Sequence, residues 1–251
     1  MEIEPFIPQS GAHYDVIVAG GGPAGLGAAV SAAMNGAKTL LLEGRASFGG
    51  IAAQALWMPL NRMYLHGESR GGVHEMLLKQ LDECGPNSYL KGRTDWFNGD
   101  NAHIQPEYLQ LAAYRLLESV GCHYRLHTPV TGAKVENGRV TAVISNNKSG
   151  EEVFYADIFV DCTGDGDIAY FSGAEMVKGS ELDGLLVAGR CASATQMGQA
   201  SGKSMGNMMD MGQAAGLAAA LCVKHGVEPR NLNVSEIQDI LIHKMGVHLF
   251  G

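Results

Sequence analysis

The stretch YDVIVAGGGPAGLGAAVSAAMNGAKTLLLE, residues 14–43, decides the fold of this chain. It begins with a short apolar run rich in β-branched residues, continues with small residues as far as Gly36, and ends in a second apolar run that stops at Glu43. The first and last runs are typical of buried strands, and the middle is typical of a helix that ends near Gly36. The stretch therefore predicts a strand–helix–strand unit.

A glycine pattern occupies the predicted turn between the first strand and the helix. Gly20, Gly22 and Gly25 form G-x-G-x-x-G, in which the first glycine permits a tight turn and the second lets the backbone approach a pyrophosphate. The third allows close packing, and the phosphate would lie at the positive end of the helix. Glu43 lies where a carboxylate accepts hydrogen bonds from ribose hydroxyls. The pattern alone could be a structural turn, but in this setting it predicts a dinucleotide site.

The composition limits the class of protein and its partners. The chain has 251 residues, is 46% hydrophobic and carries a formal net charge of −8, which predicts a folded globular protein with no nucleic-acid partner. The start of the chain has no apolar signal-peptide core, and no stretch reaches the roughly 20 apolar residues of a membrane span, so we expect a cytoplasmic protein without membrane contact. The 5 cysteines form no CxxC pattern, so we expect reduced thiols and no metal site.

The rest of the chain predicts one domain over residues 1–251. Amphipathic patterns predict helices within 71–85 and 105–121, ending at Gly85 and Gly121. Short alternating runs with an Asn-Gly turn at 137–138 predict an antiparallel β-meander inserted over about 122–156. A strand at 185–189, a helix over about 207–225 and a short last helix with Ser235 as its N-cap follow.

The order of elements distinguishes between two dinucleotides. A nicotinamide-binding domain would continue as alternating strands and helices, whereas here helices and a meander precede FVDCTGDGD, which favours FAD. With GGGPAG, FGG at 48–50, CTGDGD at 162–167 and GLLVAGR at 184–190, the chain resembles the FAD-dependent oxidoreductases of the glutathione-reductase-like two-dinucleotide-binding superfamily. The resemblance implies an α/β, Rossmann-like FAD-binding domain, with a parallel sheet and helices, plus the small β-meander. It also implies hydride transfer between a small-molecule substrate and FAD.

The resemblance also implies which residues contact FAD. The ADP half would be held by the glycine turn and the end of the second strand, and the flavin half by the later motifs. The implied residues are Gly20, Gly22, Pro23, Ala24, Gly25, Glu43, Gly44, Arg45, Gly49, Gly50, Val130, Thr163, Gly164, Gly189, Arg190, Asn207 and Met208. Gly49 and Gly50 could instead be an ordinary loop, Thr163 and Gly164 a strand-end turn, and Arg190 a surface cation.

One part of the resembled proteins is essentially missing. Members of the group usually have a large substrate domain before GLLVAGR, and this chain has only the short join 176–183. One alternative is therefore a trimmed or engineered FAD-binding module with no substrate of its own. Another is a thiazole-synthase-like enzyme, although the reactive-cysteine signature of thiazole synthases is not evident.

The missing domain also bears on catalysis and assembly. Gln54, Arg62 and His66 follow the FGG motif and are weak catalytic candidates, since such residues are more often loop or packing residues. An uncovered flavin would leave an apolar patch, so we expect a homo-oligomer or a partner subunit that covers it. The patch would comprise Trp57, Met58, Leu60, Met63, Met208 and Met209. The alternative is that these side chains fold into the chain's own core.

Overall fold

The structure is a computed structural model that describes residues 8–55, 59–65, 68–95, 99–175, 182–195, 198 and 204–248. Trp57, Met58, His66 and most of the join 176–183 lie outside these residues, so the predictions made for them are not addressed by the structure.

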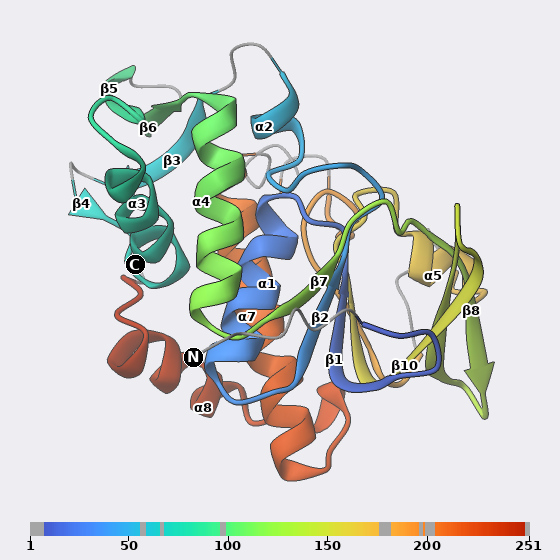
Figure 1. Ribbon diagram of the computed structural model, residues 1–251. Coiled ribbons are helices and arrows are strands. Elements are labelled where there is room, and N and C mark those ends of the chain that lie inside the picture. Colours follow the sequence, from blue (N-terminus) through green and yellow to red (C-terminus); the bar gives the residue numbers. More distant parts are fainter. Residues whose placement is uncertain are drawn as a thin grey trace, which may run out of the picture.

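A mixed sheet forms the centre of the described chain (Figure 1). Neighbouring strands follow the order β7-β2-β1-β10-β9-β8, and β11 pairs with β10. The pairs β7–β2, β2–β1, β1–β10 and β10–β11 are parallel, whereas β8, β9 and the first half of β10 form an antiparallel meander. The strands are β1 (His13–Ala19), β2 (Thr39–Leu42), β7 (His123–Arg125), β8 (Val130–Glu136), β9 (Arg139–Asn147), β10 (Gly150–Asp161) and β11 (Leu185–Val187). The predicted α/β class is confirmed.

Strand β7 differs from the prediction, which placed it inside the meander. It is a parallel edge strand beside β2, with Leu40 opposite His123 and Leu42 opposite Arg125. The meander itself starts at Val130. Alternation of apolar and polar residues indicates that a run is a strand, but it does not indicate which strand lies beside it.

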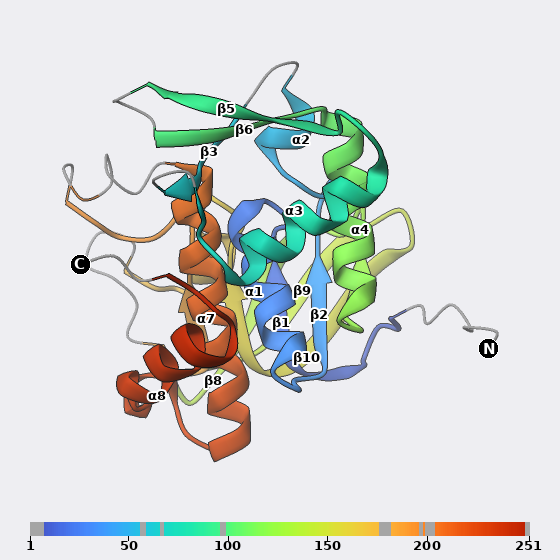
Figure 2. The same ribbon diagram turned by 90° about the vertical axis from the view of Figure 1, so that its left-hand side faces the viewer.

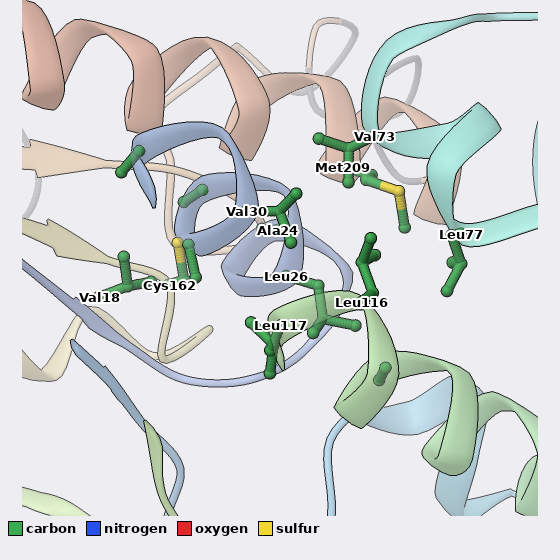
Figure 3. Close-up of a cluster of buried hydrophobic side chains, with 14 of the residues drawn as sticks. Val18, Ala24, Leu26, Val30, Val73, Leu77, Leu116, Leu117, Cys162 and Met209 are labelled. Atoms are coloured by element: carbon green, nitrogen blue, oxygen red, sulfur yellow. The ribbon is translucent and has the colours of Figure 1, made fainter. Parts of the chain in front are cut away.

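Helices pack on one face of the parallel strands, and the meander folds over the other (Figures 1 and 2). Val16 and Val18 of β1 belong to the core shared with the helices, whereas Ile17 and Ala19 belong to the core shared with the meander, as the twofold period of a strand requires. Figure 3 shows part of the helical core. The helices around this core are α1 (Pro23–Met34), α3 (Gly72–Cys84), α4 (Pro106–Ser119) and α7 (Met205–His225).

Helices α1 and α7 lie in close contact because glycines occupy their interface. A Cβ atom at Gly212 would lie 1.9 Å from the main-chain oxygen of Ala24, and one at Gly216 would lie 2.0 Å from that of Ala28. These distances leave no room for a side chain. The close approach brings the N-terminal ends of both helices to the same edge of the sheet.

A second, four-stranded antiparallel sheet lies at the end of the molecule where α7 begins (Figure 2), and the sequence patterns did not predict it. Its order is β4-β3-β6-β5, formed by β3 (Leu60–Leu65), β4 (Glu68–Ser69), β5 (Tyr89–Asp95) and β6 (Gly99–Ile104). Leu60, Met63 and Met209 are all buried, so the expectation that they form an exposed patch was wrong. This sheet and α7 bury them within the chain's own core.

The remaining elements are short. They are α2 (Ile51–Gln54), α5 (Asp167–Phe171), a 3₁₀ turn (Pro229–Asn231), α8 (Val234–Asp239) and a π-helical turn (Ile240–Lys244). Asn233, and not Ser235, caps α8, because the Asn233 side chain accepts a hydrogen bond from the Ser235 N–H. The helices in the described ranges are all too short or too polar to span a bilayer.

Candidate functional site

A cleft of about 690 Å³ opens at the carboxyl ends of β1 and β10, beside the first turns of α1 and α7. Open α/β sheets bind ligands at such an edge. The lining includes most of the residues implied for FAD, together with Gln54: Gly20, Gly22, Pro23, Ala24, Glu43, Arg45, Gly50, Gln54, Thr163, Gly164, Gly189, Arg190 and Met208. Three further lining residues, Ile51, Cys162 and Met205, were not predicted. Folding thus brings four separated motifs together.

Some predicted residues do not line this cleft. Gly25, Gly44 and Gly49 lie beside lining residues without lining the cleft themselves, and Val130 is buried at the start of β8. The amide of Asn207 faces Arg70, and Arg62 lies on β3. These positions separate residues that could touch a ligand from residues that support the cleft.

The glycine turn contains two kinds of glycine. A Cβ atom at Gly20 would lie 2.4 Å from the main-chain oxygen of Cys162, and one at Gly25 would lie 1.6 Å from that of Gly20, so internal packing requires both. A Cβ atom at Gly22 would meet nothing closer than the Cα of Gly50, at 3.9 Å, and the φ of Gly22 is −74°, which any residue adopts. The space beside Gly22 therefore opens into the cleft.

The first turn of α1 is suited to an anion. Gly22 is its N-cap and makes no side-chain capping hydrogen bond, and Pro23 follows at the first position. Helix N-termini carry unsatisfied N–H groups and a partial positive charge, so they bind phosphate groups. The open space at Gly22 gives such a group access to the backbone.

Glu43 connects the end of β2 to the glycine turn. Its Oε2 accepts a hydrogen bond from the Gly21 N–H at 2.6 Å, and its Oε1 accepts one from the Arg45 N–H at 2.8 Å. A carboxylate has about four acceptor positions, so Glu43 can accept further hydrogen bonds from a ligand. The main-chain oxygen of Glu43 accepts from the Thr128 N–H at 2.9 Å, which brings the segment before Val130 to the same edge.

A buried carboxylate that the sequence analysis did not single out organises the CTGDGD loop. Asp161 is fully buried, and its Oδ1 accepts hydrogen bonds from the Thr163 hydroxyl at 2.8 Å and the Thr163 N–H at 3.1 Å. Its Oδ2 accepts from the Ala169 N–H at 3.0 Å. The Thr163 oxygen in turn accepts from the N–H groups of Gly166 and Asp167, at 3.0 and 2.9 Å. The position of Asp161 at the end of a buried strand was the sequence feature that could have predicted this role.

Arg190 lies at the rim of the cleft, where it is both a lining residue and a surface cation. Its guanidinium pairs with the Asp165 carboxylate at 3.0 Å, and both side chains are largely exposed. Such a pair contributes little to stability. The guanidinium also lies over Gly164, whose Cβ atom would be 2.9 Å from its nitrogen.

The thiols near the cleft are neutral at ordinary pH. Burial raises the pKa of Cys162 well above its usual range and that of Cys191 to about 11. Neither is therefore a reactive thiolate. Over the described ranges, no group of three or more His, Cys, Asp or Glu side chains could hold a metal ion.

The comparison with known families decides the class of protein. The sequence profile of the family described as FAD dependent oxidoreductase matches residues 15–184 and 180–241, which is most of the chain. The chain belongs to the FAD-dependent oxidoreductase family. This flavoenzyme therefore uses FAD. A dinucleotide phosphate must approach the backbone closely, and the open space at Gly22 allows this approach, whereas a side chain at this position would occupy that space.

One relative of this FAD-dependent oxidoreductase agrees with that class. The flavoenzyme is 35% identical over 179 residues to 6-methylpretetramide 4-monooxygenase of Streptomyces rimosus, which is 64% of this chain and 40% of the relative. The chain thus spans less than half the length of that relative.

Two solved structures show the same fold as this flavoenzyme. A geranylgeranyl bacteriochlorophyll reductase-like protein from Thermoplasma acidophilum has a TM-score of 0.63 and 13% identity, with coverage of 93% of this chain and 84% of that one. THI4 from Thermovibrio ammonificans has a TM-score of 0.58 and 18% identity, with coverage of 84% and 90%. The identities are low, so these likenesses concern the fold alone.

Proposed function

We propose that this protein transfers a hydride between a small-molecule substrate and FAD bound in the cleft. The observation that supports this placement most strongly is Gly22, whose missing side chain leaves open space at the first turn of α1. Flavin supplies the capacity to accept or donate a hydride, while the protein binds and orients it. The family fits this chemistry, since its members are FAD-dependent oxidoreductases.

Each part of the cleft has a proposed role toward the cofactor. The Gly22 backbone and the first amides of α1 would bind the pyrophosphate, and Glu43 would accept hydrogen bonds from the ribose. The backbone at Val130 would contact adenine. Gly189 and Arg190, with the helix that follows, would hold the ribityl chain, and Thr163 and Gly164 would lie near the nucleotide. The first turn of α7 would direct its amides to the flavin ring.

The described lining of the cleft is predominantly apolar. Ile51, Met205 and Met208 would exclude water, and the amide of Gln54 can donate or accept a hydrogen bond. Among the described lining residues, the ionisable groups are Glu43, Arg45, Cys162 and Arg190. We assign none of them to proton transfer, and Gln54 remains the catalytic candidate with direct access to the cleft.

Two alternatives remain from the sequence. A thiazole-synthase-like activity is one of them, but the raised pKa values of Cys162 and Cys191 argue against a reactive cysteine at this cleft. In an FAD-binding module without its own substrate, flavin would be bound but no specific compound would reduce it. A homo-oligomer or partner subunit also remains a proposal, and light scattering at micromolar concentration tests it.

The test uses the purified protein. Its absorbance should show bound oxidised flavin, and an anaerobic screen of small molecules should find a class that bleaches this absorbance at a saturable rate. Activity with oxygen or dyes alone would not count, because free flavin also reacts with them. Bound flavin that no substrate class reduces would favour the FAD-binding module without its own substrate. A purified protein that contains neither oxidised nor reduced flavin would refute the proposal.

A further inference from the structure

A cluster of polar side chains joins the segment before α3 to the first turn of α7. Nη1 of Arg70 donates hydrogen bonds to Oδ1 of Asn207 at 2.6 Å and to the main-chain oxygen of Arg62 at 3.2 Å. Nη2 of Arg70 forms an ion pair with Asp210. The Arg70 side chain is only 17% exposed, so these contacts are shielded from solvent. One guanidinium thus connects α7 to β3.

His74 supports the same turn from α3. Its side chain is fully buried, and Nε2 lies 3.0 Å from the main-chain oxygen of Gly206. Because a carbonyl oxygen only accepts, Nε2 carries the proton. Nδ1 then faces Oδ1 of Asp210, at 3.4 Å. The first turn of α7 is therefore contacted through both its backbone and its side chains.

The main chains of α7 and β3 also touch at this point. A Cβ atom at Gly206 would lie 2.3 Å from the main-chain oxygen of Arg62, and Arg62 has a φ of +59°, which is uncommon for a residue with a side chain. The Arg70 hydrogen bond reaches the same Arg62 oxygen. Arg70 thus holds an unusual backbone conformation against the helix.

The cluster lies behind the cleft and not in it. Met205 and Met208 line the cleft from the first turn of α7, whereas Arg70 and His74 are not among its lining residues. The position of this turn sets where both methionines and the helix amides lie. A lysine could not replace Arg70, since one ammonium lacks the planar fork that reaches acceptors on two elements.

We propose that Arg70 is a positioning residue for the cofactor, because it holds the first turn of α7 against β3 and so places that turn at the wall of the cleft. The inference rests on the proposed binding of FAD in this cleft. It assigns no contact between Arg70 and FAD.

The test compares Arg70→Lys with Gln213→Met. Gln213 is buried on the same helix and accepts a 2.7 Å hydrogen bond from the Val73 N–H, so this control weakens the α3–α7 contact about one and a half turns along α7 from the lining residue Met208. Arg70→Lys should weaken FAD binding by about tenfold and change the visible circular dichroism of bound flavin at saturating FAD. Gln213→Met should lose stability but retain both properties.

The outcomes separate this inference from the proposed function. Wild-type FAD affinity and dichroism in Arg70→Lys, or equal changes in Gln213→Met, would overturn the positioning role. If Arg70→Lys does not fold, Asp210→Asn tests the positioning role instead, since it removes the negative charge that pairs with Arg70. This variant should change the dichroism of bound flavin in the same direction. Unchanged dichroism would again overturn the role. If Gly22→Val binds FAD normally, the placement of FAD in this cleft is itself wrong.

Discussion

The main-chain N–H of Gly21 donates a 2.6 Å hydrogen bond to Oε2 of Glu43, and this bond links the glycine turn after β1 to the end of β2. Glu43 is only 9% exposed, and its other oxygen accepts from the Arg45 N–H. The carboxylate therefore shapes the loop in addition to its proposed contact with the ribose.

Glu43→Ala should weaken FAD binding and also destabilise the protein. Loss of a hydrogen bond to a charged group predicts roughly 10- to 150-fold lower affinity, and two N–H groups left without their acceptor predict about 1–3 kcal/mol lower free energy of unfolding. Flavin titration and urea unfolding measure the two effects. Asp15→Ala is the control, because Asp15 also accepts a main-chain N–H, from Lys38, but away from the cleft. Unchanged FAD affinity in Glu43→Ala would contradict the ribose assignment.

Gly22→Val and Gly25→Ala should have opposite effects. Val fits the backbone conformation of Gly22 but fills the space beside it, so this variant should fold normally and lose FAD. A Cβ atom at position 25 would lie 1.6 Å from the oxygen of Gly20, so Gly25→Ala should cost about 1–3 kcal/mol or more of stability. Thermal unfolding of the apoprotein measures the loss of stability, and the flavin content of the purified protein measures the loss of FAD binding. Full flavin content in Gly22→Val would refute the pyrophosphate site.

Asp161→Asn should disturb the cleft far more than Asp165→Asn, although both residues lie in one motif. An amide at position 161 keeps only one acceptor oxygen, so its NH2 group would face either the Thr163 N–H or the Ala169 N–H, at a cost of about 1–3 kcal/mol. We expect weaker FAD binding, because the loop that contains Thr163 loses one of these hydrogen bonds. Asp165 is exposed and pairs only at the rim, so its variant should resemble wild type. Equal FAD affinity in both variants would show that the buried carboxylate does not support the site.

Gly216→Ala should destabilise the protein, although alanine favours helix formation by about 0.8–1.0 kcal/mol. The added Cβ atom would lie 2.0 Å from the main-chain oxygen of Ala28, so α1 and α7 must separate. We expect a net loss of about 1–3 kcal/mol in urea unfolding. A variant as stable as wild type would mean that the helices are not packed as closely as described.

The pair formed by His74 and Asp210 has opposing effects on stability as pH falls. Burial, helped by the charge of Arg70, lowers the pKa of His74 from 6.5 to about 4, so between these values the unfolded chain binds a proton that the native chain does not. Burial raises the pKa of Asp210 from 3.8 to about 6, against the charge of Arg70, so there the native chain binds the extra proton. Acidification therefore loses stability through His74 and gains it through Asp210.

Asp210→Asn should make the protein more sensitive to acid. Without the gain from Asp210, the loss from His74 is uncompensated, so stability relative to wild type should fall by roughly 1–3 kcal/mol between pH 6.5 and 4. Urea unfolding at a series of pH values measures this difference, and comparison with wild type cancels the other titrating groups. Parallel curves for the two proteins would refute the opposing titrations.

Local sequence was enough to predict the strand–helix–strand unit and the motifs that converge on the cleft. Gly20, with a φ of +93°, shows why, since a tight turn of that conformation needs glycine wherever it occurs. The spacing from Gly22 to Glu43 is likewise set by one helix and one strand, so both residues reach the same edge of the sheet.

Only the tertiary structure decided which residues face the ligand and which support it. Gly22 and Gly25 were both expected to contact FAD, yet Gly22 borders open space and Gly25 packs against Gly20. The burial of Met63 depends on a second sheet, and the orientation of Asn207 depends on Arg70, from another part of the chain. The sequence by itself determined the turn and the spacing, because these depend on neighbours along the chain, whereas strand partners, burial and side-chain direction arise from contacts between distant residues.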